Sequence, residues 1–399
     1  MKFLFITTNN LSTNPRLRKE IYHAASRNDS IHLVAFKLDN WSDRFDREIV
    51  SNLKMESTCL SATRHPYPSW FRATLVNLVC KILWPFFKKN IKITAFAHHK
   101  RSYQLIQALK RIRHPADRVI SHNLGALYPA WWFARKHGLP FNFDVEDYYP
   151  GEKMNNPQSA EKARRLYLMR ELMPDASHVT YAAPLIGQKV QEEIPLHRER
   201  FILINNTFPE AEFIRENRTE THSKIQLIWF SQKIGYHRGL EPLIRALSHW
   251  SEKFSLTLAG WMDPVFYREH IAEHEAFITC LDPLPQQELH RRLSNYDVGL
   301  AVENAASDLN RDICLTNKIW AYYLSGLYIL ASDTSAQLEF MTQRKDHGMT
   351  FNPDTLDGSL LFIQQEIETI RVRSKERQRR ALKESYEAEI PRLEATWRN

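Results

Sequence analysis

Residues 316–333, TNKIWAYYLSGLYILASD, decide how this chain is expected to fold. Apolar and aromatic residues recur at near-helical spacing from Ile319 to Leu324, and Gly326 stands where such a helix would stop. The apolar run LYILAS follows at once and predicts a strand that ends at Asp333. A helix that leads directly into a buried strand is the repeating unit of an α/β domain with a parallel sheet.

Polar residues stand at the entrance of this predicted helix, namely Thr316, Asn317 and Lys318. The start of a helix presents unpaired backbone N–H groups and a partial positive charge, which suits a phosphate. The competing interpretation is an ordinary helix-to-strand unit with a chance lysine in its first turn.

The rest of the second half repeats the same alternation of strands and helices. Its first predicted strand, 225–231, is followed by a loop that contains Gln232, Lys233, Gly235 and Arg238, and a helix comes next. A flexible backbone and a forked cation at the end of a strand can meet a phosphate. We therefore expect Arg238 and Lys318 to lie on one rim of the sheet.

The first half also reads as α/β. Residues 2–8 predict a strand, Asn14 is placed to cap a helix that starts at Pro15, and residues 31–36 predict a second strand. This βαβ opening favours a parallel, doubly wound sheet. No GxGxxG follows the first strand, so the fingerprint of a dinucleotide cofactor is absent.

Two later strands of the first half end in polar residues. The strand 118–122 leads to His122 and Asn123, and the strand 140–145 leads into an acidic cluster with Asp144, Glu146 and Asp147. Open α/β sheets bind ligands at the carboxyl ends of their strands, where carboxylates can hydrogen-bond a polyhydroxylated substrate. The alternative is a solvated acidic turn.

The length of 399 residues suits two domains of ordinary size. We predict a first domain over 1–208, a polar linker over 209–223 and a second domain over 224–370. The remaining residues, 371–399, are predicted to form a charged helix that is interrupted by Pro391 and packs back on the first domain.

A basic insert in the first domain, 64–118, holds twelve Lys or Arg residues against the single Asp117. Its first part predicts a helix flanked by tryptophans and lysines, a pattern typical of a helix that lies in an anionic membrane surface. The alternative is an amphipathic helix packed on the sheet, with its cations merely solvated. The residues on the apolar face are Phe71, Leu75, Leu78, Val79, Ile82, Leu83 and Phe86.

Other classes fit the composition less well. Four scattered cysteines lack the spacing of a disulfide framework or of a zinc site, and a reducing compartment is expected. We expect neither a signal peptide nor a transmembrane segment, because no apolar run is long enough. Nucleic-acid binding is not expected despite the net charge of +8, because the basic insert is interleaved with apolar residues at helical spacing.

Five stretches together resemble the GT-B glycosyltransferases, most of all glycosyltransferase family 4 and relatives that build bacterial surface polysaccharides. The resemblance covers nearly the whole chain, and the last two stretches are the specific ones. They are TNPRLRKE (13–20), SHN (121–123), FDVEDYYPGE (143–152), FSQKIGYHRGLEPLI (230–244) and NKIWAYYLSGLYILASD (317–333).

The resemblance implies two Rossmann-like, doubly wound domains facing a central cleft. A nucleoside-diphosphate sugar would serve as donor and bind the second domain through a donor site that contacts the diphosphate, while a glycan or lipid-linked acceptor would bind the first. No other cofactor and no metal is implied. The donor-site residues would be Gln232, Gly235, Arg238, Thr316, Asn317 and Lys318, the catalytic residues His122, Asp144 and Glu146, and the acceptor-binding residues Asn14, Asn123 and Asp147.

Two positions depart from the family pattern. Ala321 stands where many members have a Glu that grips the donor ribose, and Ile313 takes the place of its partner carboxylate. Glu303, Asp308 or Asp312 in the preceding stretch can substitute. The expected activity is transfer of a hexose-type sugar, with retention of configuration, at the inner face of the cell membrane in the cytoplasm. An epimerase-type enzyme and a catalytically silent GT-B protein are the alternatives.

Overall fold

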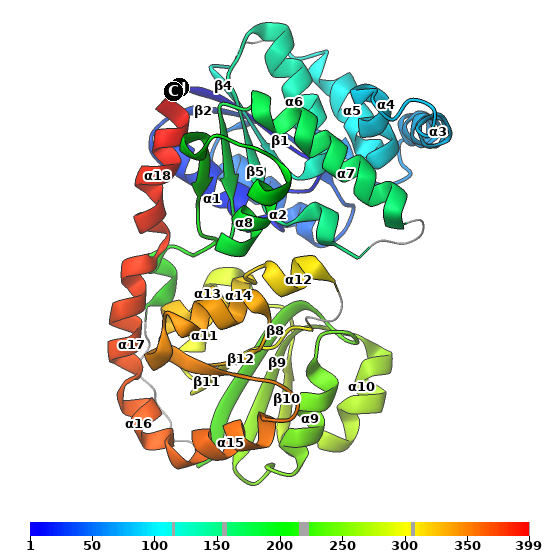
Figure 1. Ribbon diagram of the computed structural model, residues 1–399. Coiled ribbons are helices and arrows are strands. Elements are labelled where there is room, and N and C mark those ends of the chain that lie inside the picture. Colours follow the sequence, from blue (N-terminus) through cyan, green and yellow to red (C-terminus); the bar gives the residue numbers. More distant parts are fainter. Residues whose placement is uncertain (114–115, 154–157, 215–222, 305–307, 399) are drawn as a thin grey trace. The chain divides into compact units, whose positions relative to one another are not determined.

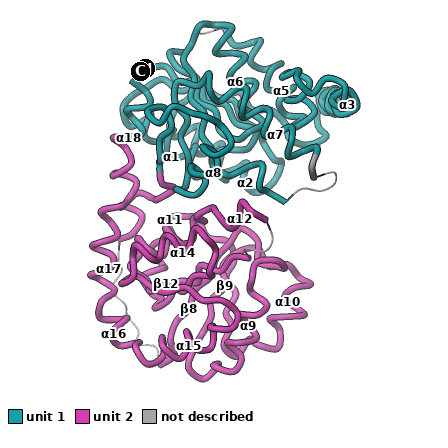
Figure 2. The backbone as a smooth tube through the Cα atoms, viewed as in Figure 1, with its two compact units in different colours: residues 1–204, 392–399 teal, residues 205–391 magenta. Residues whose placement is uncertain are grey.

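The computed structural model describes residues 1–113, 116–153, 158–214, 223–304 and 308–398. The chain divides into two compact units (Figure 2). Unit 1 comprises residues 1–204 and 392–399, and unit 2 comprises residues 205–391. Each unit is built on one parallel sheet that is flanked by helices (Figure 1).

Unit 1 contains a seven-stranded sheet in the order β3-β2-β1-β4-β5-β6-β7. All neighbouring pairs run parallel. The order reverses beside β1, between β1 and β4, which is the switch point where doubly wound sheets bind ligands. The strands are β1 (Lys2–Thr7), β2 (Ser30–Lys37), β3 (Glu56–Ser61), β4 (Arg118–His122), β5 (Phe141–Val145), β6 (His178–Tyr181) and β7 (Phe201–Leu203).

The helices of unit 1 follow the predicted alternation. Helix α1 begins at Pro15, and the Asn14 side chain accepts a hydrogen bond from the Leu17 N–H at 3.0 Å, so the predicted cap is confirmed. The helices are α1 (Pro15–Ser26), α2 (Ser42–Asn52), α3 (Tyr67–Leu83), α4 (Ile91–His98), α5 (Lys100–Leu109), α6 (Leu124–His137), α7 (Gln158–Leu172) and α8 (Pro184–Glu193).

Unit 2 contains a six-stranded parallel sheet in the order β10-β9-β8-β11-β12-β13. The order reverses beside β8, so β8 and β11 form the second switch point. The strands are β8 (Ile225–Ile234), β9 (Phe254–Met262), β10 (Ile278–Leu281), β11 (Val298–Ala301), β12 (Tyr328–Ser332) and β13 (Gly348–Phe351).

Residues 317–332 form helix α13, followed by strand β12. Every residue of α13 from Lys318 to Ser325 is buried, and Gly326 ends the helix at φ 73°, a left-handed conformation that glycine adopts without strain. The helices of unit 2 are α9 (Leu240–Ser248), α10 (Pro264–His270), α11 (Gln286–Leu293), α12 (Leu309–Ile313), α13 (Asn317–Ser325), α14 (Ser335–Thr342), α15 (Leu356–Gln365), α16 (Ile367–Val372) and α17 (Ser374–Ala381).

The C-terminal region is broken into several helices, and the prediction of one charged helix over 371–399 is wrong. Helix α17 ends at Ala381 and α18 spans Tyr386–Arg398. The break before α17 lets Ser374 and Arg377 donate hydrogen bonds to the Gly326 carbonyl at 3.1 Å each, which ties α17 to the end of α13. Pro391 lies inside α18 and does not interrupt it.

The division of the chain also differs in detail from the predicted domains. Unit 1 ends at Ile204, and residues 205–208 cluster with unit 2. Within the predicted linker, Glu210–Phe213 form a short 3-10 helix that belongs to unit 2. The rest of the linker, 215–222, lies outside the described residues. Residues 392–398 of α18 cluster with unit 1.

Helix α3 stands at the periphery of unit 1, beside α4 and α5 (Figure 1). Most of its large apolar side chains are 36% to 61% exposed, so the interpretation of this face as packed on the sheet is wrong. The helix ends at Leu83, before Pro85, and Phe86 therefore lies beyond it. Among the described residues, we find no helix with the length and apolar character needed to span a bilayer. The exposed apolar side chains of α3 are Phe71, Leu75, Leu78, Val79, Ile82 and Leu83.

Candidate functional site

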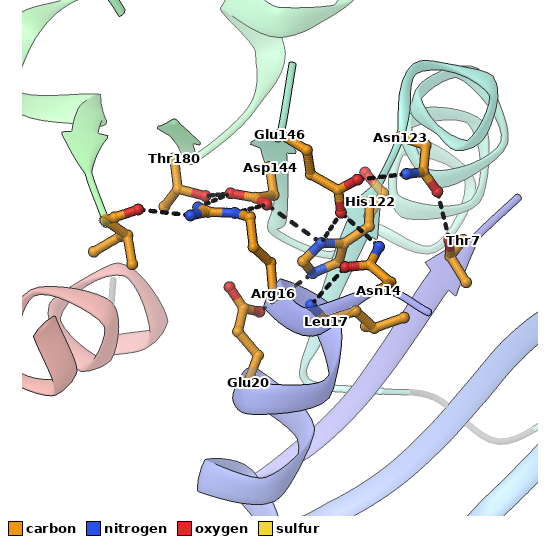
Figure 3. Close-up of polar contacts among 12 residues, drawn as sticks. Thr7, Asn14, Arg16, Leu17, Glu20, His122, Asn123, Asp144, Glu146 and Thr180 are labelled. Atoms are coloured by element: carbon orange, nitrogen blue, oxygen red, sulfur yellow. Dashed lines mark hydrogen bonds and ion pairs between the residues drawn. The ribbon is translucent and has the colours of Figure 1, made fainter. Parts of the chain in front are cut away.

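Polar side chains gather at the switch point of each sheet, and each cluster lies within its own unit. In unit 1 they come from the ends of β1, β4 and β5 and from α1 (Figure 3). In unit 2 they come from the ends of β8 and β11 and from the start of α13. Each unit therefore has a candidate cluster of its own.

In unit 1, the imidazole of His122 is surrounded by carboxylates and is 0% exposed. Its Nδ1 lies 3.0 Å from Glu146 Oε1 and 3.3 Å from Asp144 Oδ2, and its Nε2 lies 3.6 Å from Glu20 Oε2. Burial by itself lowers the pKa of His122, but the hydrogen bond with Glu146 and the nearby carboxylates of Asp144 and Glu20 outweigh it and raise the pKa well above its usual value. This direction favours the protonated imidazole.

Arg16 of α1 is the second cation of this cluster (Figure 3). Its Nε and Nη2 each donate to one oxygen of Asp144 at 2.6 Å, and its Nη1 donates to the Ile204 carbonyl at 2.6 Å. Although burial favours the neutral acid, Arg16 and His122 hold the pKa of Asp144 far below its usual range. Sequence reasoning missed Arg16, whose signal was a cation in the first turn of a helix beside an acidic strand end.

Glu146 is the member of the cluster that remains open to solvent, with 15% of its side chain exposed. Asn14 donates to its Oε1 at 2.6 Å, and Asn123 donates to its Oε2 at 2.6 Å. Asn123 is held in turn by Thr7, which donates to the Asn123 side-chain oxygen at 2.5 Å. The backbone of Asn123 has φ 70° and ψ 146°, a strained conformation that is common at functional sites.

The structure thus separates the predicted catalytic residues into two kinds. Glu146 has its oxygens fixed and partly exposed, so it can accept a hydrogen bond from a substrate hydroxyl. His122 and Asp144 are enclosed by their partners, and His122 contacts the Glu146 carboxylate. Of the predicted acceptor-binding residues, Asn14 and Asn123 hold Glu146, and Asp147 is half-buried just after β5.

The same residues form a possible metal-binding group, because ligand atoms of His122, Asp144 and Glu146 lie within 4.8 Å of one another. The donor set does not suit a metal ion. Both oxygens of Asp144 already accept hydrogen bonds from the Arg16 guanidinium, so this carboxylate is not free to bind a metal ion.

In unit 2, Lys318 in the first turn of α13 is buried. Its Nζ lies 2.5 Å from Glu303 Oε1 and 5.3 Å from the centre of the Trp229 ring. The Glu303 backbone N–H donates to Ser332 Oγ at 2.9 Å, which ties the chain after β11 to the end of β12. The Lys318 ammonium therefore pairs with the Glu303 carboxylate.

The loop between β8 and α9 contains the predicted Arg238, which is half-buried. Arg238 makes no side-chain hydrogen bond or ion pair with any other residue that the structure describes. The neighbouring Gly239 has φ 76°, and a Cβ there would lie 2.8 Å from Val302 Cγ1, so the loop packs against the residue before Glu303. The loop, the end of β11 and the start of α13 therefore converge on Glu303.

The other predicted donor-site residues are Gln232, Gly235, Thr316 and Asn317. Gln232 is exposed within β8, which runs three residues further than predicted and carries an irregularity between Phe230 and Lys233. Gly235 is buried, and its backbone does not require glycine because φ is not positive. Thr316 precedes α13 as its N-cap residue, and Asn317 Oδ1 accepts from Asn206 Nδ2 at 2.6 Å.

Lys233, the cation next to Gln232, is predicted in the same loop as Arg238 but lies within β8, because this strand is longer than predicted. Its Nζ lies 2.9 Å from Asp263 Oδ2, and its side chain is largely exposed.

Solved structures of other proteins share this fold over the full length of the chain. HepE of Anabaena, solved with UDP, with UDP and glucose and with UDP-glucose, is 12% identical in its UDP complex, with a TM-score of 0.67 over 100% of this chain and 99% of that chain. Sucrose-phosphate synthase from Thermosynechococcus elongatus is 12% identical, with a TM-score of 0.69 over 100% of this chain and 98% of that chain.

The chain has the GT-B fold.

A Listeria monocytogenes structure described as a putative UDP-N-acetylglucosamine 2-epimerase is 10% identical, with a TM-score of 0.56 over 94% of this chain and 90% of that chain. No family model matches the sequence, and no curated protein sequence matches it. The reaction therefore has to be argued from the site.

Proposed function

We propose that this protein is a glycosyltransferase that moves a sugar from a nucleoside-diphosphate sugar to a hydroxyl of a glycan acceptor in bacterial surface polysaccharide synthesis. The observation that carries the proposal is Arg238, a half-buried cation without a described partner at the switch point of the unit 2 sheet. A guanidinium in that place matches the geometry of a diphosphate. The full-length GT-B fold, shared with HepE bound to UDP, supports the same donor class.

In the proposed reaction, the bond between the anomeric carbon and the diphosphate oxygen breaks, and the acceptor oxygen forms the new bond. Arg238 and the backbone N–H groups at the start of α13 stabilise the negative charge on the departing diphosphate. We propose that Lys318 adds its charge when a bound diphosphate takes the place of Glu303 as its partner. Because protein cations supply this charge, we propose that activity needs no divalent metal and persists in a chelator.

In unit 1, we propose that Glu146 accepts a hydrogen bond from the acceptor hydroxyl and orients its oxygen toward the anomeric carbon. Asn14, Asn123 and the His122 imidazolium fix the Glu146 carboxylate for this role. Following the family resemblance, we propose that the anomeric configuration is retained, which an NMR measurement of the anomeric coupling in the product tests.

We also propose that the protein works at the inner face of the cell membrane on a lipid-linked acceptor. The support is the exposed apolar face of α3 together with cations on its flanks. By helical spacing, Arg72 and Lys81 stand on opposite flanks of that face, and neither pairs with a carboxylate of any described residue. Apolar side chains entering the lipid boundary and cations facing anionic headgroups both favour binding.

The direct test is release of nucleoside diphosphate from UDP-, GDP- and ADP-sugars, with and without a lipid-linked glycan acceptor. A glycosyltransferase produces nucleoside diphosphate and a larger glycan only when the acceptor is present. An epimerase would change the donor sugar without an acceptor, and a silent binding protein would turn over no donor. Either of these two results would refute the proposed function.

A further inference from the structure

A second concave site lies in unit 1 beside helix α3, and nothing in the proposed reaction uses it. The cavity has a volume of about 650 Å³, in the range of small-molecule sites. It lies against the edge strand β3 and is bordered by the start of α3 and by α5. We call it the edge pocket. It shares no lining residue with the cluster around Glu146, which belongs to the ends of β4 and β5.

The charged lining of the edge pocket is entirely basic. Three arginines line it, Arg72 from α3 and Arg111 and Arg113 after α5, and His32 lies at its base in β2. Arg72 and Arg111 make no side-chain hydrogen bond or ion pair with the rest of the described chain. No Asp or Glu occurs between Glu56 and Asp117 in the sequence. Guanidinium groups without carboxylate partners are suited to bind a phosphate.

The other lining residues suit a phosphate that carries a polar ester group. Tyr103, Gln104 and Gln107 of α5 line the wall and bring hydroxyl and amide groups that can hydrogen-bond glycerol-type hydroxyls. The ligand that matches this lining is a phosphodiester with a hydroxylated substituent. Such groups occur in the headgroups of anionic lipids and in soluble metabolites.

The position of the edge pocket favours the lipid source. Pro68, Ser69 and Arg72 line the pocket from the same helix, next to the face that carries Phe71, Leu75 and Leu78 in solvent. Arg72 thus stands between the pocket and the apolar face. A headgroup held by Arg72 and Arg111 would leave its acyl chains beside that face.

We propose that the edge pocket binds the phosphate headgroup of an anionic lipid and anchors the protein to the membrane at a site separate from the sugar-transfer site. This inference rests on the proposed membrane association. It adds a specific contact between the pocket and the phosphate group. General attraction between a basic protein surface and an anionic membrane does not require such a contact.

The test compares two kinds of vesicle with equal surface charge. One contains phosphatidylglycerol, and the other obtains its charge from a carboxylate lipid. Binding of the full chain is measured by flotation at fixed ionic strength. We expect the wild-type protein to bind the phosphatidylglycerol vesicles at least about fivefold more tightly, because Arg72 and Arg111 can contact the phosphate while Gln104 and Gln107 hydrogen-bond the glycerol hydroxyls beside it.

Three variants separate the causes. Arg72→Gln with Arg111→Gln removes two pocket cations and should abolish the phosphate preference, whereas Lys81→Gln with Lys89→Gln removes two exposed cations outside the pocket and should keep it. Leu78→Ser with Ile82→Ser should weaken binding to both vesicles alike. Soluble glycerophosphoglycerol should compete with phosphatidylglycerol vesicles for the wild-type protein but not for the Arg72/Arg111 variant.

Each contrary result has a distinct meaning. Equal binding of the wild-type protein to both vesicles, or equal loss in both charge variants, would overturn the edge pocket while membrane docking through α3 stands. Binding of glycerophosphoglycerol by a protein that binds neither vesicle would overturn the lipid source. Absence of binding in every case would overturn both the pocket and the membrane proposal, and sugar transfer would then be judged by donor turnover alone.

Discussion

At the scale of single residues, the most unusual feature is a histidine cation enclosed by acids. Replacing His122 by Gln removes a positive charge that faces Asp144, Glu146 and Glu20. Leaving buried carboxylates with fewer partners should lower the free energy of unfolding by about 3–5 kcal/mol. Chemical denaturation monitored by circular dichroism measures this difference. A loss below about 1 kcal/mol would show that these contacts are not tight in solution.

The same histidine predicts how stability depends on pH. The folded-state pKa of His122 is raised above the value of about 6.5 in the unfolded chain. Its contribution is therefore fully present below about pH 6.5 and is lost as pH rises through the folded-state pKa. Over that range, the wild-type protein should lose stability relative to His122→Gln. Parallel curves for the two proteins from pH 6 to 9 would contradict the assignment of His122 as an imidazolium.

Lys318 and Glu303 form a second buried charge pair whose two halves should be coupled. Lys318→Met should destabilise the protein by about 3–5 kcal/mol, because it leaves Glu303 buried without its cation. Adding Glu303→Leu should restore part of that loss, as measured by a double-mutant cycle. Additive effects of the two substitutions would mean that the pair does not form in solution.

At the scale of elements, the loop between β8 and α9 should depend on one glycine. Gly239→Ala forces a side chain into φ 76° and against Val302, so it should cost about 1–3 kcal/mol and weaken nucleotide binding by shifting Arg238. The matched control is Gly358→Ala in α15, where a Cβ meets nothing within 4 Å. That change should be neutral or stabilise by up to about 1 kcal/mol, because alanine favours a helix. Melting temperatures of the two variants provide the comparison.

The apolar face of α3 gives a prediction in which membrane binding and stability separate. Leu78 and Ile82 are exposed, so Leu78→Ser with Ile82→Ser should leave the melting temperature nearly unchanged while membrane binding falls. Buried Ala73 and Cys80 lie on the opposite side of the helix and provide the contrast, because Ala73→Leu should destabilise the protein by overpacking. A large stability loss on changing Leu78 and Ile82 would mean that this face is covered within the protein.

At the scale of the whole molecule, the sequence predicts two α/β units with good boundaries for most strands. Hydrophobic periodicity is a local property, and β4, α1 and α13 follow it closely. The division of the C-terminal region into α15 to α18 escaped prediction, because it depends on the contacts of Ser374 and Arg377 with Gly326, far away in the sequence. A continuous charged stretch carries no local signal for such breaks.

The sequence indicates where the candidate site residues gather, but it does not indicate which of them form ion pairs with one another. The ends of parallel strands place His122, Asp144 and Glu146 together, as the sequence indicates. No local sequence pattern indicates that Arg16 forms an ion pair with Asp144, or that Lys318 forms an ion pair with Glu303. These are contacts between charged groups 128 and 15 residues apart, and they decide which side chains stay open to a substrate.

We propose that unit 2 binds a nucleoside diphosphate through Arg238. The most direct measurement is the thermal shift caused by UDP, GDP and ADP in the wild-type protein, in Arg238→Gln and in Arg245→Gln, a control that removes an exposed arginine from α9. A ligand at about 100 times its Kd adds about 2.7 kcal/mol of stability. We expect one nucleotide to raise the Tm of the wild-type and Arg245→Gln proteins but not the Tm of the Arg238→Gln protein. An equal shift in all three proteins, or no shift with any nucleotide, would contradict it.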